Sequence, residues 1–233
     1  MNKKTILILL LATAAWSEPR AEMCTRVVYT GPEETTLTGR TMDWKEDPQS
    51  KLWVFPRGMR RDGAAGANSL EWTSKYGSVV TSAYDICTTD GMNEKGLAAN
   101  LLWLAESEYP ANDGRKPALS VSAWTQYVLD NFATVDEAVA AFSGGEFDVV
   151  SDMMPDEPNI SSTRWRTVAD QKNRVYYYES VLYPFLIWVD FDELDFTAGA
   201  PVGMIDPASG KRYAGNTSAE FSPAEPFVFQ AAK

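Results

Sequence analysis

The chain has 233 residues, of which 45% are hydrophobic and 12% aromatic, so one globular domain can bury a substantial core. Its formal net charge is −11, and an acidic surface of this kind argues against nucleic acid or an anionic membrane as a partner. The chain contains no histidine and only two cysteines, which excludes the familiar zinc and iron sites. We therefore expect no metal and no cofactor.

Residues 1–23 have the pattern of a leader peptide. Lys3 and Lys4 form a positive n-region, and an apolar run over residues 6–15 is too short to span a bilayer. The sequence thus predicts a periplasmic or secreted protein without a membrane span. Residues 24–233, after this leader, are expected to form a single domain.

The point at which the leader is removed determines what Cys24 can do. Ala15 or Ala21 would suit a signal peptidase, but either leaves extra residues ahead of Cys24. Exposing the amine of Cys24 therefore requires a second trimming step after Met23. A lipid anchor on Cys24 is the alternative, but the residues that precede it are not those such processing usually requires.

Cys24 stands at the head of a strand-like run that ends at Tyr29, and Arg40 and Asp43 lie on a second predicted strand after an acidic turn. Without histidine, a nucleophilic cysteine cannot use the usual imidazole base. An N-terminal Cys24 would instead carry its own base, because an α-amine has a reference pKa of roughly 7.7–8.0. Arg40 would favour the thiolate, since a nearby cation lowers the pKa of a thiol, and Asp43 could orient the amine.

Simpler interpretations remain open on these residues alone. A lone cysteine beside a strand is most often a small buried hydrophobe. Arg40 and Asp43 are three apart, so they point to opposite faces of a strand unless a bulge rotates one of them. The second cysteine, Cys87, lies in an apolar strand pattern over residues 83–87. A Cys24–Cys87 disulfide would be usual in an oxidising compartment and incompatible with a free catalytic thiol.

The remaining pattern consists of strands, then two helices, then strands. Periodicity predicts strands at residues 52–56, 69–73, 76–84, 97–104, 147–150, 163–169, 174–180 and 186–191. Helices are predicted at residues 118–132 and 135–142. An exposed loop or hairpin tip is expected at residues 57–68, and a loop or linker at residues 151–162. A tight turn is expected at residues 93–96, and the tail from residue 197 is expected to wrap the surface. This order predicts an α+β protein built on mostly antiparallel sheets.

Three segments carry a family resemblance: Met23–Arg26 with Gly39–Trp44, Asp90–Leu97 followed by Asn100–Leu104, and Thr163–Asp170. In this order and spacing they resemble the choloylglycine hydrolase family, which contains bile salt hydrolases and penicillin V acylases. The similarity runs from Cys24 to about Val150 and again from about Asn159 to the C-terminal part. The resemblance implies an N-terminal-nucleophile αββα sandwich that hydrolyses linear amides, such as conjugated bile acids, penicillin V or N-acyl homoserine lactones.

The resemblance also assigns roles to residues. Cys24 matches the family's nucleophile, and Arg40 and Asp43 match the arginine and aspartate beside it. Trp103 falls where the family places a residue that lines the oxyanion site, and Trp44 and Trp103 would offer an apolar wall for the acyl group. The family is often tetrameric, so the resemblance implies a homo-oligomer.

One departure from the family pattern comes after Val150. Family members continue there through several strands and helices, which supply an asparagine in a Met-Thr-Asn-x-Pro motif and a second arginine. Neither motif is present here, so we expect an internal deletion near residues 150–160 and a fold that is incomplete in its second half. The alternative function is therefore a catalytically weak or inactive relative that acts as a binding or structural periplasmic protein.

Overall fold

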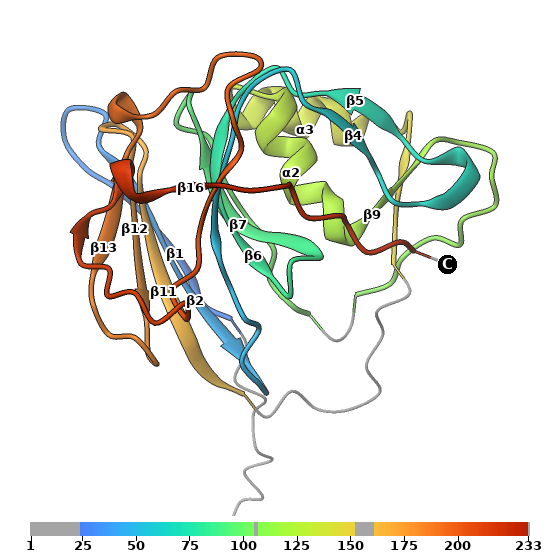
Figure 1. The fold of residues 1–233 in the computed structure, drawn as a ribbon. Helices are drawn as coiled ribbons and strands as arrows, with labels where there is room; N and C mark the ends of the chain where they lie inside the picture. The colour runs from blue at the N-terminus through green and yellow to red at the C-terminus, as the bar shows by residue number, and fades with distance from the viewer. Residues whose placement is uncertain (1–23, 105–106, 152–160, 233) are drawn as a thin grey trace, which may run out of the picture.

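The computed structural model describes residues 24–104, 107–151 and 161–232 (Figure 1). Two sheets pack face to face, and the helices α2 (Val121–Asn131) and α3 (Val135–Ser143) cover the far side of one of them. The predicted leader and most of the predicted loop at 151–162 lie outside the described residues.

The first sheet has six strands in the order β1-β2-β11-β12-β13-β15. They span Arg26–Thr30, Thr36–Trp44, Ser162–Asp170, Val175–Ser180, Ile187–Asp190 and Gly215–Asn216. Neighbouring strands are antiparallel except for β13 and β15. This sheet brings β2, which carries Arg40 and Asp43, between β1 and the later strand β11.

The second sheet also has six strands, in the order β16-β14-β3-β6-β7-β8. They span Ser222–Pro223, Gly203–Ile205, Leu52–Phe55, Ser78–Ala83, Cys87–Asn93 and Ala98–Asn100, and all neighbours are antiparallel. Two strand pairs lie outside the main sheets. The antiparallel pair is β4 (Arg60–Asp62) with β5 (Glu71–Thr73), and the parallel pair is β9 (Ala118–Ser120) with β10 (Asp148–Val150).

Burial follows the layer order. Strand β12 alternates, with Tyr176 and Tyr178 buried and Tyr177 half-buried, as expected for a sheet with one face in the core. Strand β6 is buried at every position, because one of its faces meets the first sheet and the other meets the helices. The cluster between the sheets includes Leu52, Val79, Met92, Trp165 and Tyr176, and the cluster under the helices includes Phe55, Leu119, Leu129, Phe227 and Phe229.

The outer face of the first sheet is the open side of this sandwich. Among the described residues, the α-helices are α2 and α3, and both lie beyond the second sheet (Figure 1). The edge strand β1 is exposed along its whole length, and Val27 keeps 61% of its surface accessible to solvent. The mostly antiparallel sheets with few helices agree with the predicted α+β class, and one helical layer of an αββα sandwich is absent from the described residues.

Most predicted elements are present, but three predictions were wrong in their extent. The first helix begins at Val121 rather than at Ala118, because residues 118–120 pair with β10 and Ser120 accepts a hydrogen bond at the helix start. The predicted strand at 97–104 ends at Asn100, and the tail from residue 197 contributes β14, β15 and β16 instead of only wrapping the surface.

The strand pattern predicted over residues 83–87 is interrupted by a turn at residues 84–86, which joins the end of β6 to the start of β7. Tyr84 and Asp85 take φ values of 52° and 50°, in the left-handed region that few non-glycine residues adopt. Asp85 is tolerated there because its carboxylate accepts hydrogen bonds from Ser82 and Trp53 and pairs with Lys51. The turn places Cys87 at the first position of β7.

Candidate active site

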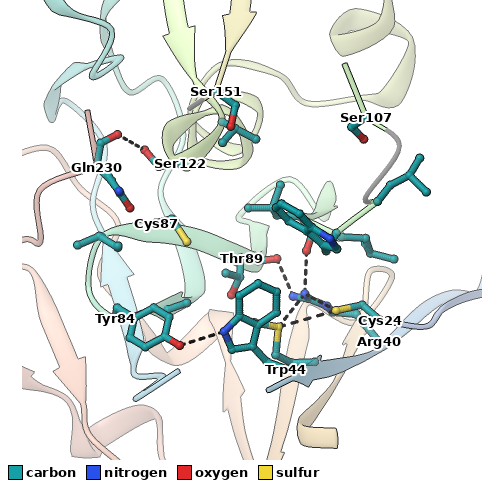
Figure 2. A pocket seen from close by; sticks show the side chains of 18 of the residues that line it. Cys24, Arg40, Trp44, Tyr84, Cys87, Thr89, Ser107, Ser122, Ser151 and Gln230 are labelled. Atoms are coloured by element: carbon teal, nitrogen blue, oxygen red, sulfur yellow. Dashed lines mark hydrogen bonds between the residues drawn. The ribbon is translucent and has the colours of Figure 1, made fainter. Parts of the chain in front are cut away.

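Cys24 lies two residues before the start of β1 and packs against the core cluster between the two sheets. Its Sγ accepts a contact from Arg40 Nη2 at 3.7 Å and lies 3.7 Å from the main-chain oxygen of Asp43 and 4.0 Å from Met42 Sδ (Figure 2). Cys24 is half-buried, so its sulfur is both held by the protein and reachable. A thiol beside a fixed cation is the arrangement that favours a thiolate nucleophile.

Arg40 is buried between the two sheets with 3% of its surface exposed. Its Nη1 donates to the Thr89 carbonyl at 2.7 Å, and its Nη2 donates to the Leu101 carbonyl at 2.7 Å and to Met42 Sδ at 3.2 Å. The guanidinium carbon also lies 4.7 Å from the ring centre of Trp165. These contacts come from both sheets and from the segment after β8, and they fix the guanidinium beside the sulfur of Cys24.

Asp43 lies on the opposite face of β2 from Arg40, because the two residues are three positions apart and side chains alternate along a strand. Its carboxylate accepts hydrogen bonds from Thr41 Oγ1 at 2.9 Å and from Thr163 Oγ1 at 2.7 Å. Thr41 Oγ1 also accepts from the main-chain N–H of Thr25 at 3.1 Å. The structure therefore links the Asp43 carboxylate to the backbone next to Cys24 through Thr41, while the Asp43 carbonyl touches the sulfur directly.

A pocket opens from Cys24 between the segment after β8 and the turn at residues 84–86 (Figure 2). Its lining is mostly apolar and includes Trp44, Tyr84, Ile86, Leu101, Leu102, Trp103, Leu104 and Val121. Trp44 and Trp103 meet edge to face, with ring centres 6.1 Å apart at an interplanar angle of 67°. The run 101–104, which the sequence predicted as a buried strand, instead forms this wall, and Leu104 remains 55% exposed.

The polar groups of Trp44 and Tyr84 in the pocket wall are hydrogen-bonded. Trp44 Nε1 donates to Tyr84 Oη at 3.0 Å, and Tyr84 Oη donates to Glu46 at 2.8 Å. Burial and the Glu46 carboxylate raise the pKa of Tyr84 to about 12, so this phenol stays protonated near neutral pH. The pairing fixes the plane of the Trp44 indole against the pocket.

Cys87 lines the same pocket, but it differs from Cys24 in its surroundings. Both cysteines are free in the structure, so the disulfide that the sequence left open is not formed. Burial raises the pKa of the Cys87 thiol to about 11, which keeps it protonated near neutral pH. Cys24 is therefore the thiol of this pocket that has a cation in contact with its sulfur.

Comparisons with known proteins bear on this site. The family described as "Linear amide C-N hydrolases, choloylglycine hydrolase family" matches residues 24–152. The penicillin V acylase of Pectobacterium atrosepticum is 32% identical over 365 residues, covering 97% of this chain and 97% of that protein. The structure of penicillin V acylase from Agrobacterium tumefaciens superposes with a TM-score of 0.82 and 34% identity, covering 89% of this chain and 99% of that chain.

The chain belongs to the choloylglycine hydrolase family. The resemblance inferred from the three sequence segments is thereby confirmed, as is the α+β sandwich of the N-terminal-nucleophile hydrolases. The family is one of linear amide C–N hydrolases, which supports an enzyme. The alignment with the Pectobacterium acylase extends over 365 residues, so it contains gaps relative to the 233 residues of this chain.

In this member of the choloylglycine hydrolase family, the structure shows main-chain groups around the pocket that the sequence did not reveal. The carbonyls of Thr89 and Leu101 fix Arg40, and the C-terminal segment reaches the pocket wall, where Ser122 Oγ donates to the Gln230 carbonyl at 2.8 Å. Main-chain oxygens carry no signature in a sequence, so periodicity could not reveal them. Within the described residues, no group of three or more Cys, Asp or Glu side chains is arranged to hold a metal ion.

Proposed function

We propose that this protein hydrolyses a linear, non-peptide amide with Cys24 as its nucleophile. The observation that carries the proposal is the position of the Cys24 sulfur, 3.7 Å from the buried guanidinium of Arg40 and at the wall of an apolar pocket. Membership of a family of linear amide hydrolases supports the same reaction class. The pocket supplies a place for the acyl group next to the attacking sulfur.

The proposed reaction has two halves. Once the leader is removed up to Met23, the α-amine of Cys24 takes the thiol proton, and the sulfur attacks the amide carbonyl carbon. The C–N bond then breaks, the leaving amine takes the proton, and the acyl group remains on Cys24 as a thioester. Water attacks the thioester, releases the carboxylic acid and restores the thiol.

The neighbouring residues have supporting roles in this proposal. Arg40 favours the thiolate by its charge. Asp43 orients the Cys24 backbone through Thr41, whose hydroxyl bonds both the Asp43 carboxylate and the N–H of Thr25. Trp103 and Trp44 line the pocket for the acyl group. The indole N–H of Trp103 can donate a hydrogen bond to the oxyanion but cannot accept one, and backbone amides supply the other donors.

The pocket and the family together indicate the substrate class. We propose an acyl group that is largely apolar, as in conjugated bile acids, penicillin V or N-acyl homoserine lactones, because the lining side chains are mostly apolar. Two relatives named penicillin V acylase make penicillin V the first substrate to try. The leader pattern supports a periplasmic or secreted location, and no helix of the described residues is long and apolar enough to cross a membrane.

A second candidate function is a catalytically weak or inactive relative with a binding or structural role. The observation that favours it is the lack of the Met-Thr-Asn-x-Pro motif and of the second family arginine, together with the proposed deletion near residues 150–160. Losing one oxyanion donor costs roughly a hundredfold or more in rate. A chain that lacks both groups could retain the pocket and lose the turnover.

We also propose that the chain forms homo-oligomers. Strand β1 exposes Val27, Val28 and Tyr29 by 61%, 48% and 55%, and exposed apolar side chains on an edge strand favour association. Sedimentation velocity at several protein concentrations tests this point. A species larger than the monomer supports it, and a monomer at every concentration contradicts it.

The test of the function combines processing and turnover. Mass spectrometry of the secreted protein should find Cys24 at the mature N-terminus with a free thiol. Incubation with penicillin V should then release phenoxyacetate, and with glycocholate glycine, while Cys24→Ala releases neither. A Cys24 that keeps its leader and yields no product from any substrate would favour the second candidate.

A further inference from the structure

Behind the candidate site lies a buried carboxylate that the proposed reaction does not use. Asp90, on β7 of the second sheet, faces Arg40, on β2 of the first sheet, and Arg40 Nη1 lies 3.6 Å from Asp90 Oδ2. The Arg40 side chain is 1% exposed and the Asp90 side chain is 2% exposed. A charge buried this deeply is stable only with a partner.

Both oxygens of Asp90 have further partners. The hydroxyl of Tyr176, on β12, donates to Asp90 Oδ1, and Asn100 Nδ2 donates to Asp90 Oδ2 at 2.6 Å. Because its one proton goes to Asp90, Tyr176 Oη accepts from Thr81 Oγ1 at 3.0 Å. Burial raises the pKa of Asp90, but the Arg40 charge and the hydrogen bonds from Tyr176 and Asn100 oppose that shift.

The two ends of the Arg40 guanidinium have different surroundings. Nη1 meets the Thr89 carbonyl and Asp90, whereas Nη2 meets the sulfurs of Cys24 and Met42 and the Leu101 carbonyl. Arg40 Nε has no hydrogen-bond partner among the described residues. Within the described residues, Asp90 is also the carboxylate that forms an ion pair with Arg40.

We propose that Asp90 and Tyr176 are positioning residues, which anchor Nη1 of Arg40 so that Nη2 is directed at the Cys24 sulfur. The inference rests on the proposed function, because it gives the anchored cation its task of favouring the Cys24 thiolate. Tyr176 acts through Asp90: its hydroxyl keeps the carboxylate turned toward Arg40. Neither residue touches the sulfur or the place of the substrate.

A second buried Arg–Asp pair, outside the candidate site, serves as a control for a purely structural role. Arg61 Nε lies 3.5 Å from Asp130 Oδ2, with side chains 5% and 0% exposed. Asp130 also accepts hydrogen bonds from Trp72 Nε1 and Gln126 Nε2, both at 2.7 Å, and burial raises its pKa as it does for Asp90. Neither Arg61 nor Asp130 lines the pocket of Cys24.

The experiment measures the rate of Cys24 alkylation by iodoacetamide against pH, followed peptide by peptide with mass spectrometry. Asp90→Asn, Tyr176→Phe and the control Asp130→Asn are compared with the unchanged protein, with urea unfolding run in parallel. We expect Asp90→Asn to move the pH midpoint of alkylation upward by about one unit, which is roughly tenfold slower labelling below the midpoint. Tyr176→Phe should give a smaller upward shift, and Asp130→Asn none.

The direction of the shift is decisive. Removing the Asp90 charge while Arg40 stays in place would leave the cation uncompensated and move the midpoint downward. An upward shift therefore reports a displaced guanidinium, and an unchanged or lowered midpoint in both Asp90→Asn and Tyr176→Phe overturns the proposal. If Asp90→Asn does not fold, Tyr176→Phe alone decides.

This readout is separate from turnover. If the unchanged protein hydrolyses no amide but the two variants show the shift, the proposed function is overturned and the positioning role stands. If the unchanged protein hydrolyses penicillin V but the two variants show no shift, the positioning role is overturned and the proposed function stands.

Discussion

At the scale of single residues, the candidate site contains one buried cation, Arg40, whose two terminal nitrogens have different partners. Arg40 touches the Cys24 sulfur with one of them and is anchored by the Thr89 carbonyl and Asp90 with the other. A lysine carries the same charge but has a single nitrogen, which cannot satisfy both sides. The geometry of the guanidinium therefore matters as much as its charge.

We expect Arg40→Lys to lower kcat/KM for penicillin V by roughly a hundredfold, equivalent to about 3 kcal/mol, because one nitrogen cannot keep both sets of contacts. Steady-state hydrolysis measures the effect. Arg166→Lys is the control, since Arg166 pairs with Glu179 on the surface with 52% of its side chain exposed. Equal activity of the two variants would show that only the charge at position 40 is needed.

The two cysteines should differ sharply in reactivity. Burial raises the pKa of Cys87 to about 11, so nearly all of this thiol is protonated near neutral pH and it reacts slowly with alkylating agents. At a pH of about 7.5 iodoacetamide should label Cys24 and spare Cys87, and Cys87 should gain label only as the pH approaches 11. In urea both should react, and equal labelling in the folded protein would contradict the assignment.

Sequence reasoning found these residues for different reasons. The absence of histidine and the family segments identified Cys24, Arg40 and Asp43, and the structure brings Arg40 and the Asp43 carbonyl to the sulfur of Cys24. The same reasoning placed Cys87 in a strand without showing that it shares the pocket. The carbonyl of Leu101 could not be predicted, because its role depends on where the chain leaves β8.

At the scale of elements, turns determine which residues reach the site. The turn after β7 was predicted correctly, with Gly96 at φ +84°. The turn at residues 84–86 was missed, because Tyr84 and Asp85 rarely adopt positive φ and their apolar neighbours resemble a strand. That turn brings Tyr84, Ile86 and Cys87 to the pocket wall.

Gly96→Ala should destabilise the fold more than Gly210→Ala, although both glycines have φ +84°. A Cβ at Gly96 would lie 2.6 Å from the main-chain oxygen of Gln171, whereas one at Gly210 meets nothing within 4 Å. We expect Gly210→Ala to cost about 1 kcal/mol and Gly96→Ala about 2 kcal/mol or more in urea unfolding. Equal costs would mean that the contact between this turn and the turn after β11 relaxes freely.

At the scale of the whole molecule, the C-terminal segment closes the core under the helices. Phe227 and Phe229 are 9% and 8% exposed and pack with Phe55 and Leu129, while Val228 between them is 80% exposed. The prediction that this tail only wraps the surface was therefore wrong, because alternate side chains of the segment enter the core. Periodicity could not show this, because proline and alanine interrupt the pattern before residue 227.

Phe227→Ala should lower the free energy of unfolding by roughly 3 kcal/mol, because a buried aromatic side chain leaves a cavity. Val228→Ala, one residue away, should change it by less than about 0.5 kcal/mol, since its side chain faces solvent. Urea denaturation followed by tryptophan fluorescence compares the two. Similar midpoints for both variants would show that the segment is only loosely attached.

The central claim is that Cys24 carries the acyl group during turnover. The most direct measurement is acid quenching of the protein during incubation with penicillin V, followed by peptide mass spectrometry. We expect a phenoxyacetyl group on Cys24, formed as the amide is cleaved and absent from Cys24→Ala. Release of phenoxyacetate with an unmodified Cys24, or equal release by Cys24→Ala, would contradict this mechanism.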